Sequence, residues 1–95
     1  MATDPLLAAL AETRRRRDQA DAEIRMLLAY ARELITPRPY RLADLADAAG
    51  MSISGVRTAY DRSDIERAAR MPVPPRSEPF RQYWTAVHAT RGEQR

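Results

Sequence analysis

Hydrogen-bonding side chains are grouped in one short stretch, between residues 52 and 58. Ser52, Ser54, Arg57 and Thr58 carry hydrogen-bond donors, and Ile53 lies among them as a short apolar side chain. Arginine can donate two hydrogen bonds to a guanine edge, hydroxyls bond to bases or phosphates, and apolar groups contact the thymine methyl. If this stretch is helical, its outward face carries no acidic group and could meet base edges in a DNA groove.

Two short helices are expected to hold these side chains in place. Leu42, Leu45, Ala46 and Ala49 recur at helical spacing and form the apolar stripe of a first helix. Gly50 follows the last of them, where a glycine can take the left-handed conformation that ends a helix. The sequence therefore predicts a helix that ends at a sharp turn.

A second helix is expected to begin directly after this turn. Ser52 is predicted to cap it, because a serine hydroxyl can accept a hydrogen bond from a free amide of the first turn. Val56, Ala59 and Tyr60 would form its inner face. Ala46 is expected at the crossing of the two helices, since only a small side chain permits a close approach there.

The stretch from Leu42 to Asp61 resembles the helix-turn-helix of bacterial, particularly actinobacterial, DNA-binding regulators. The resemblance rests on the small residue Ala46, on Gly50 in the turn, on apolar Met51 after it and on Val56 in the second helix. It implies transcriptional control or a role in a mobile element, with the second helix in the major groove. The same pattern also describes a connector in a small helical bundle, and the sequence leaves this alternative open.

Arginines flank the two helices at positions suited to the DNA backbone. The connector from Thr36 to Arg41 contains two prolines and is expected to be stiff and extended. It ends in an arginine where a Ser, Thr or Asp cap is typical. The missing cap either leaves the amides of the next helix free for a phosphate or marks a frayed helix start. The residues expected to contact the backbone are Arg38, Tyr40, Arg41 and Arg62.

A long helix is predicted before this connector. Asp4 and Pro5 form a strong start signal, and neither glycine nor proline occurs again before Pro37. Alternating spacings of three and four give this helix the a/d seam of a coiled coil. The seam consists of Leu6, Leu10, Thr13, Arg17, Ala20, Ile24, Leu27, Ala31 and Leu34.

The middle of the seam is polar and interrupts the apolar pattern. Arg14–Arg17 is interpreted as a solvent-facing turn, with a supplementary phosphate contact as the alternative. Pairs at i, i+4 are expected to support it, and these are Glu12 with Arg16, Arg14 with Asp18, and Asp21 with Arg25.

Each end of this long helix is expected to pack differently. The C-terminal patch should form the first helix of a three-helix DNA-binding domain and pack on Leu45, Ala49 and Val56; its residues are Ile24, Leu27, Leu28, Ala31, Leu34 and Ile35. The N-terminal patch, Leu6, Leu7 and Leu10, has no local partner and predicts a homodimer. The alternative is that the helix breaks in the arginine block, so that these leucines fold back on Phe80 and Trp84.

Two further helices are expected after the core. Ser63 and Glu66 have capping-box spacing and predict a short helix to about Arg70. A proline-rich linker follows, and a last helix opens after Ser77. One face of that helix is expected to be buried on the bundle, in a dimer or against a protein partner, with base stacking as the alternative. This face carries Phe80, Tyr83, Trp84 and Val87, with His88 beside it.

Composition excludes several classes of function. The 95 residues carry a net charge of +3, with 16 basic side chains that are all arginine and with no cysteine. The sequence contains no membrane-length apolar run, catalytic motif or metal-ligand spacing, so we expect a cytoplasmic protein without enzymatic activity, metal or cofactor. The basic balance favours a polyanionic partner, namely double-stranded DNA.

The predicted architecture is therefore all-α, with a helical arm over residues 1–23, a helix-turn-helix domain over 24–71, and a linker and aromatic helix over 72–95. A helical adaptor that uses the helix-turn-helix only as scaffold is the alternative. Acidic residues that nearly cancel the local arginines make it credible: Asp44, Asp47, Asp61, Asp64 and Glu66. Their position relative to Arg57 discriminates between the two.

Overall fold

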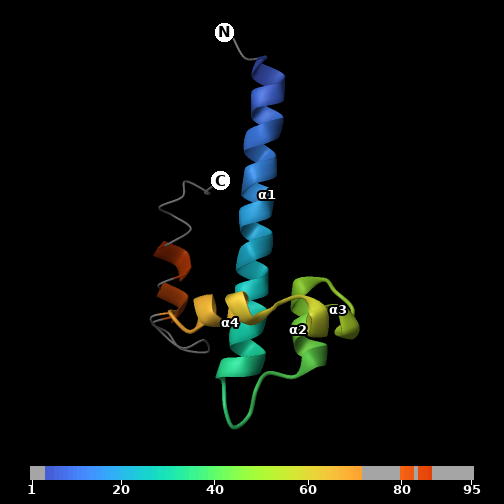
Figure 1. Cartoon of the computed structure of the whole chain (residues 1–95), viewed down its shortest axis with the longest axis vertical. Helices are drawn as coiled ribbons and strands as arrows, with labels where there is room; N and C mark the ends of the chain where they lie inside the picture. Colours follow the sequence, from blue (N-terminus) through green and yellow to red (C-terminus); the bar gives the residue numbers. More distant parts are fainter. Residues whose placement is uncertain (1–3, 72–79, 83, 87–95) are drawn as a thin grey trace.

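The computed structural model describes residues 4–71, 80–82 and 84–86, and these residues contain helices and loops but no strand. A long helix, α1 (Pro5–Ala29), runs on into a π-helical turn, η1 (Tyr30–Leu34). Three short helices follow: α2 (Leu42–Ala49), α3 (Ile53–Thr58) and α4 (Arg62–Ala68). Figure 1 shows α2 and α3 beside the C-terminal half of α1, whose N-terminal half extends away from them. The predicted all-α class is confirmed.

The start of α1 follows its sequence signal. The Asp4 carboxylate accepts hydrogen bonds from the backbone N–H groups of Leu6 at 2.8 Å and Leu7 at 3.3 Å, and Pro5 occupies the first helical position. The helix is continuous through the arginine block, so the break that a fold-back of the N-terminal leucines requires is absent.

Two of the three predicted ion pairs along α1 are confirmed. Arg14 lies 3.8 Å from Asp18, and Arg16 lies 3.6 Å from Glu12. The third prediction, Asp21 with Arg25, is wrong, because Arg25 turns toward α4 and lies 3.7 Å from Asp64. A tertiary partner that is itself buried has replaced the exposed local one.

The core forms where α1, α2 and α3 meet. Leu28, Ala46 and Val56 are buried together, and Val56 is fully buried. Gly50 ends α2 with φ of 71°, as predicted, in a conformation that strains any residue with a Cβ. The half-buried residues packed around this centre are Ile24, Leu42, Leu45, Ala49, Ala59 and Tyr60.

The end of the long helix differs from the sequence expectation. Its last five residues form the wider π-turn rather than an α-helical one, and Ile35 then leaves in an extended conformation. Leu34, expected on the core face, is 37% exposed, because the wider turn rotates it away from the α-helical stripe. The backbone N–H of Tyr40 donates to the Ala31 carbonyl at 3.1 Å, which returns the chain toward α2.

The cap of α4 lies two residues before the predicted one. The predicted box of Ser63 and Glu66 is wrong, since Asp61 accepts from the backbone N–H of Asp64 and the Asp64 carboxylate accepts from that of Asp61. Ser63 instead lies inside the helix and donates its hydroxyl to Asp61 at 3.0 Å. The backbone N–H of Asp64 and this hydroxyl lower the pKa of Asp61, so the stabilisation it gives is lost as the pH falls through that lowered pKa.

Helix α4 crosses α1 and is anchored by a buried acid (Figure 1). Asp64 is 4% exposed and Ala68 is fully buried at this crossing. The Asp64 carboxylate lies 3.1 Å from the Arg67 guanidinium and 3.7 Å from that of Arg25 on α1. Asp64, which the sequence placed among the acids that offset nearby arginines, therefore joins α4 to α1.

A tyrosine links the loop before α4 to η1. The Tyr60 hydroxyl donates to the Glu33 carboxylate at 2.6 Å. Burial, followed by this hydrogen bond, raises the pKa of Tyr60 to about 12. Because the folded-state pKa lies above the unfolded one, the stabilisation is complete below about pH 10 and is lost as the pH rises toward the folded pKa.

We expect the free energy of unfolding to fall between about pH 10 and pH 12, and to fall less in Tyr60→Phe. The chain contains neither lysine nor cysteine, so tyrosines are the side chains that titrate in this range. Urea unfolding at a series of alkaline pH values measures the effect. Glu33→Gln is the companion variant, since it removes the carboxylate that accepts from Tyr60, and it should also lower the slope. Equal slopes in wild type and Tyr60→Phe would contradict the role of this hydrogen bond.

Phe80 and Trp84 lie together on one face of the C-terminal helical segment, as their spacing predicts. Residues 80–82 and 84–86 are helical, and the rings of Phe80 and Trp84 stack with centroids 5.9 Å apart and an interplanar angle of 16°. Tyr83, Val87 and His88, which the sequence placed on or beside the same face, lie outside the described residues. Among the described residues, no helix is both long and apolar enough to cross a membrane.

Candidate nucleic-acid interface

Helix α3 turns one side into the core and leaves the other exposed. Val56 is fully buried, whereas the predicted base-reading residues all lie at the surface, with Ile53 44% exposed. The structure thus brings the whole predicted set to one exposed helix; the set is Ser52, Ile53, Ser54, Arg57 and Thr58. Val56 is the buried residue of α3 and points into the core, so the opposite side of the helix faces away from α1 and α2.

Hydroxyl groups at the two ends of α3 serve the helix itself. The Ser52 hydroxyl accepts a hydrogen bond from the backbone N–H of Gly55 at 2.9 Å and caps the helix, as predicted. The Thr58 hydroxyl donates to the Ser54 carbonyl at 3.2 Å. The side chains of Ser54 and Arg57 make no such bond within the described part of the chain, so they are the donors available to a ligand.

Gly55 is a residue of this site whose role the sequence did not reveal. A Cβ at this position would lie 3.1 Å from the Ser52 hydroxyl oxygen and 3.6 Å from the Met51 Cβ. Glycine inside a six-residue helix costs stability, and that cost was the available signal. Its absent side chain leaves room for the cap that starts α3.

The residues expected at the DNA backbone lie around the start of α2 and the start of α4. Arg38, Arg41 and Arg62 are exposed, and Tyr40 is half-buried. The Arg32 guanidinium donates to the Tyr40 carbonyl at 2.7 Å, which clamps the connector onto η1. Arg41 precedes α2 without capping it by its side chain, as predicted.

Arg41 already has an acidic neighbour. Its guanidinium lies 3.5 Å from Asp44, in a pair whose side chains are 81% and 61% exposed. Such exposed pairs contribute about 0–1 kcal/mol, so a phosphate can replace the carboxylate at little cost. Arg38 and Arg62 form no ion pair with any described residue and need no such exchange.

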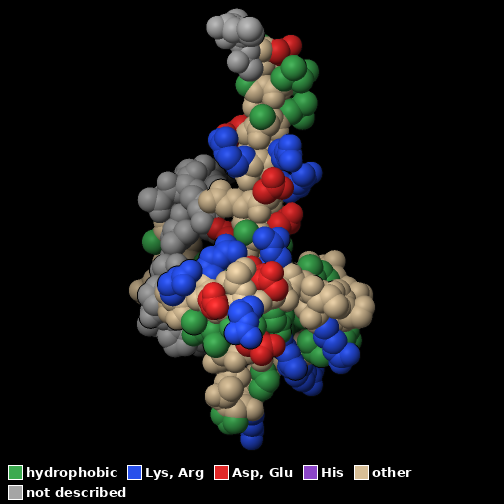
Figure 2. Space-filling model, viewed as in Figure 1, with side chains coloured by type: hydrophobic (Ala, Val, Ile, Leu, Met, Phe, Trp, Pro, Cys, Tyr) green, Lys and Arg blue, Asp and Glu red, His purple; other side chains and the backbone are tan. Residues whose placement is uncertain are grey.

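Two of the five acids that could oppose DNA binding are held within the fold. Asp64 is buried against α1 and Asp61 caps α4, whereas Asp44 pairs with Arg41 beside the expected backbone contact. No carboxylate of the described residues forms an ion pair with Arg57, and Asp47 and Glu66 are exposed. In Figure 2, acidic and basic side chains mix over the crossing of α4 and α1, whereas basic ones lie along the lower edge of α2 and α3.

Metal-ligand geometry is absent from the described segments. They contain no group of three or more His, Cys, Asp or Glu side chains that could hold a metal ion. Comparison of the chain with protein-family models, with curated proteins and with solved structures found no match. The geometry of α2, the turn and α3 is therefore the basis for any functional inference.

Proposed function

We propose that this protein binds double-stranded DNA in a sequence-specific manner, with α3 in the major groove. One observation carries the proposal: α2, Gly50 and α3 pack through Ala46 and Val56, and this packing leaves Arg57 exposed and without an ion pair to any described residue. A small exposed helix held at a fixed angle is what major-groove recognition needs.

The base contacts would come from a few side chains of α3. Arg57 is the long donor and suits a guanine, whose two acceptors match a guanidinium. Ser54 would contact adenine or phosphate and Ile53 a thymine methyl. Thr58, whose hydroxyl hydrogen is used within α3, would accept from an adenine amino group. Ser52 would act through its cap, because its hydroxyl holds the first turn of the helix that enters the groove.

The phosphate contacts would come from the flanks of α3 and fix its register. Arg38 and Arg41 extend from the clamped connector beside the uncapped start of α2, and Arg62 lies on the first turn of α4. Contacts of this kind position the protein but carry no sequence information. A role in transcription or in a mobile element, in the cytoplasm, is the corresponding biological proposal.

We expect Arg57→Ala and Arg38→Ala to weaken binding in different ways. Arg57→Ala should lose about 1–3 kcal/mol on a specific site and little on random DNA, because it removes a base contact. Arg38→Ala should weaken binding to all duplexes alike and lower the salt dependence, because it removes a phosphate contact. Gel-shift titrations on genomic and random fragments at several salt concentrations measure both effects.

Arg15→Ala provides the control, since it removes the same charge from the exposed rod of α1 far from α2 and α3. It should leave both affinities close to wild type. Equal, sequence-independent losses from Arg57→Ala and Arg38→Ala would show that α3 does not read bases. No salt-dependent binding to any duplex would favour the adaptor.

A further inference from the structure

Three large apolar side chains are exposed at the N-terminal end of α1. Leu6, Leu7 and Leu10 are 69%, 60% and 58% exposed. The helix that carries them is continuous, so they stay well beyond the crossing of α1 with α4. Grouped leucines of this kind on a soluble helix indicate a contact surface.

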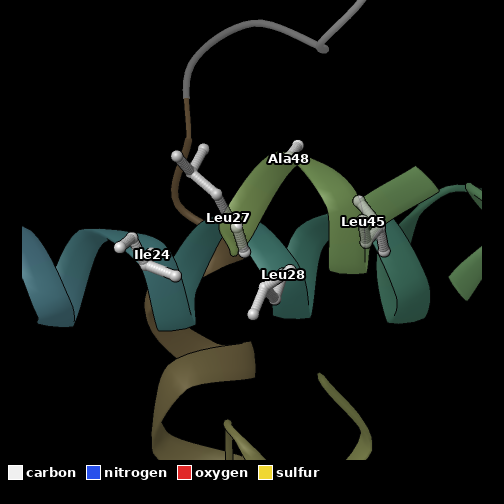
Figure 3. A pocket seen from close by; sticks show the side chains of 6 residues that line it. Ile24, Leu27, Leu28, Leu45 and Ala48 are labelled. Atoms are coloured by element: carbon white, nitrogen blue, oxygen red, sulfur yellow. The ribbon is translucent and has the colours of Figure 1, made fainter. Parts of the chain in front are cut away.

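An apolar groove lies at the other end of the same helix. Its volume is about 180 Å³, and its walls come from α1 and α2, as Figure 3 shows. Leu27 is half-buried and Ala48 exposed, so the groove opens to the surface. The complete lining consists of Ile24, Leu27, Leu28, Leu45, Ala48 and Ala49.

Leu6 and Leu10 lie on the same side of α1 as the groove, and Leu7 borders them. Leu6 and Ile24 are 18 residues apart, as are Leu10 and Leu28. At roughly 3.6 residues per turn this separation is about five full turns, so each pair points in nearly the same direction. One helix face therefore offers apolar side chains at its start and an apolar groove near its end.

We propose that α1 pairs with α1 of a second copy in the antiparallel direction, centred on Arg17. Two residues of the different copies then lie opposite each other when they are equally far from residue 17 on its two sides. The opposing pairs are Leu6 with Leu28, Leu7 with Leu27, and Leu10 with Ile24. Both grooves are filled at once and both sets of leucines are covered. Such self-complementarity is what a two-fold interface requires, and it identifies a second copy of this chain as the occupant.

The charges between the two apolar ends favour the same direction. In an antiparallel pair, residues on the same side of the seam in the two helices lie next to each other. Residue 14 of one copy is then opposite residue 20 of the other, so Arg14 lies one residue from Asp21 of that copy. Arg14 is free to do so, since its pair with Asp18 is exposed. A parallel pair in register would instead set the whole Arg14–Arg17 blocks side by side. In the antiparallel pair only Arg17 faces its own copy, and its long side chain can turn to water.

Cysteine cross-linking tests the direction, because the chain has no cysteine of its own. Thr13 and Ala20 lie on the seam and are exposed, so Thr13→Cys and Ala20→Cys should leave the fold intact. A mixture of the two variants should form a disulfide-linked dimer under mild oxidation. Thr13→Cys alone should not, because its partner cysteine would lie about 12 Å away along the axis, too far for a disulfide. Cross-linking of Thr13→Cys alone, with none added in the mixture, would overturn the antiparallel arrangement.

Sedimentation equilibrium of the full chain tests the surface itself and does not depend on DNA. Wild type should dimerise at micromolar concentration, and Leu10→Glu and Ala48→Glu should each raise the dissociation constant by about 100-fold or more, since each change is repeated in both copies. Ala8 is exposed on the opposite side of α1, so Ala8→Glu should leave the dissociation constant unchanged. A monomeric wild type, or a dimer that persists in both charged variants, would overturn the proposal. Thermal unfolding of each variant confirms that the monomer still folds.

Discussion

Replacement of Asp64 by alanine is expected to lower the free energy of unfolding by about 2–4 kcal/mol. The substitution removes one half of the capping box, in which the Asp64 carboxylate accepts from the backbone N–H of Asp61 at 3.1 Å. It also removes the acid that Arg67 contacts at 3.1 Å and Arg25 at 3.7 Å. Helix α4 would keep the Asp61 cap but lose the reciprocal half of the box and the charged link to α1 together. Urea unfolding at neutral pH, followed by circular dichroism, measures the change.

Glu66→Ala is the matched control for this change. Glu66 lies two residues further along α4, carries the same charge and is exposed. Its removal should alter the free energy of unfolding by less than about 0.5 kcal/mol. If Asp64→Ala were as mild as Glu66→Ala, the anchoring of α4 to α1 through a buried acid would be wrong.

Replacement of Ala46 by leucine is expected to destabilise the fold by about 1–3 kcal/mol. Ala46 is 6% exposed and packs against Leu28 and Val56 at the centre of the core. Three additional heavy atoms at this point must push α3 away from α2 or force strained side-chain conformations. In a chain of 95 residues with a small core, such a loss is a large part of the total stability.

Ala43→Leu provides the control for the added volume, because Ala43 lies on α2 but is exposed. It should change the midpoint of thermal unfolding little, whereas Ala46→Leu should lower it by several degrees, about 4–8 °C for each kcal/mol in a domain of this size. An unchanged midpoint in Ala46→Leu would mean that the two helices do not cross at this residue.

Local signals were sufficient to predict much of the fold. Asp4 and Pro5 start α1, Gly50 ends α2 with positive φ, and Ser52 caps α3, all as the sequence indicated. In each case the residue types needed for the feature lie within one helical turn of one another. Side-chain spacing also predicted that Val56 would face the core.

The features that escaped prediction depend on residues far apart in the chain. Arg25 pairs with Asp64 rather than with Asp21, and Tyr60 bonds to Glu33 across 27 positions. The packing of α4 on α1 determines the first contact and that of the loop before α4 on η1 the second, and no local pattern encodes either. The π-turn before Ile35 was missed for a related reason, since its sequence is compatible with an ordinary α-helix.

The exposure of the candidate site could be predicted from the sequence, but its hydrogen bonding could not. Ser52, Ile53, Ser54, Arg57 and Thr58 are all exposed, as the spacing indicated. The hydroxyls of Ser52 and Thr58 form hydrogen bonds within their own helix, and these bonds depend on the rotation of each side chain. The site therefore has fewer free hydrogen-bond donors than its residue types suggested, and Arg57 is the long side chain among those that remain.

Selection of bound duplexes from a random library, followed by sequencing, tests sequence-specific binding by α3 most directly. Wild type is expected to enrich a defined motif, and Arg57→Ala to relax one position of that motif, a guanine, while the others are kept. Arg15→Ala should return the wild-type motif unchanged. An unenriched library with wild type, or an identical motif with Arg57→Ala, would contradict base reading by α3.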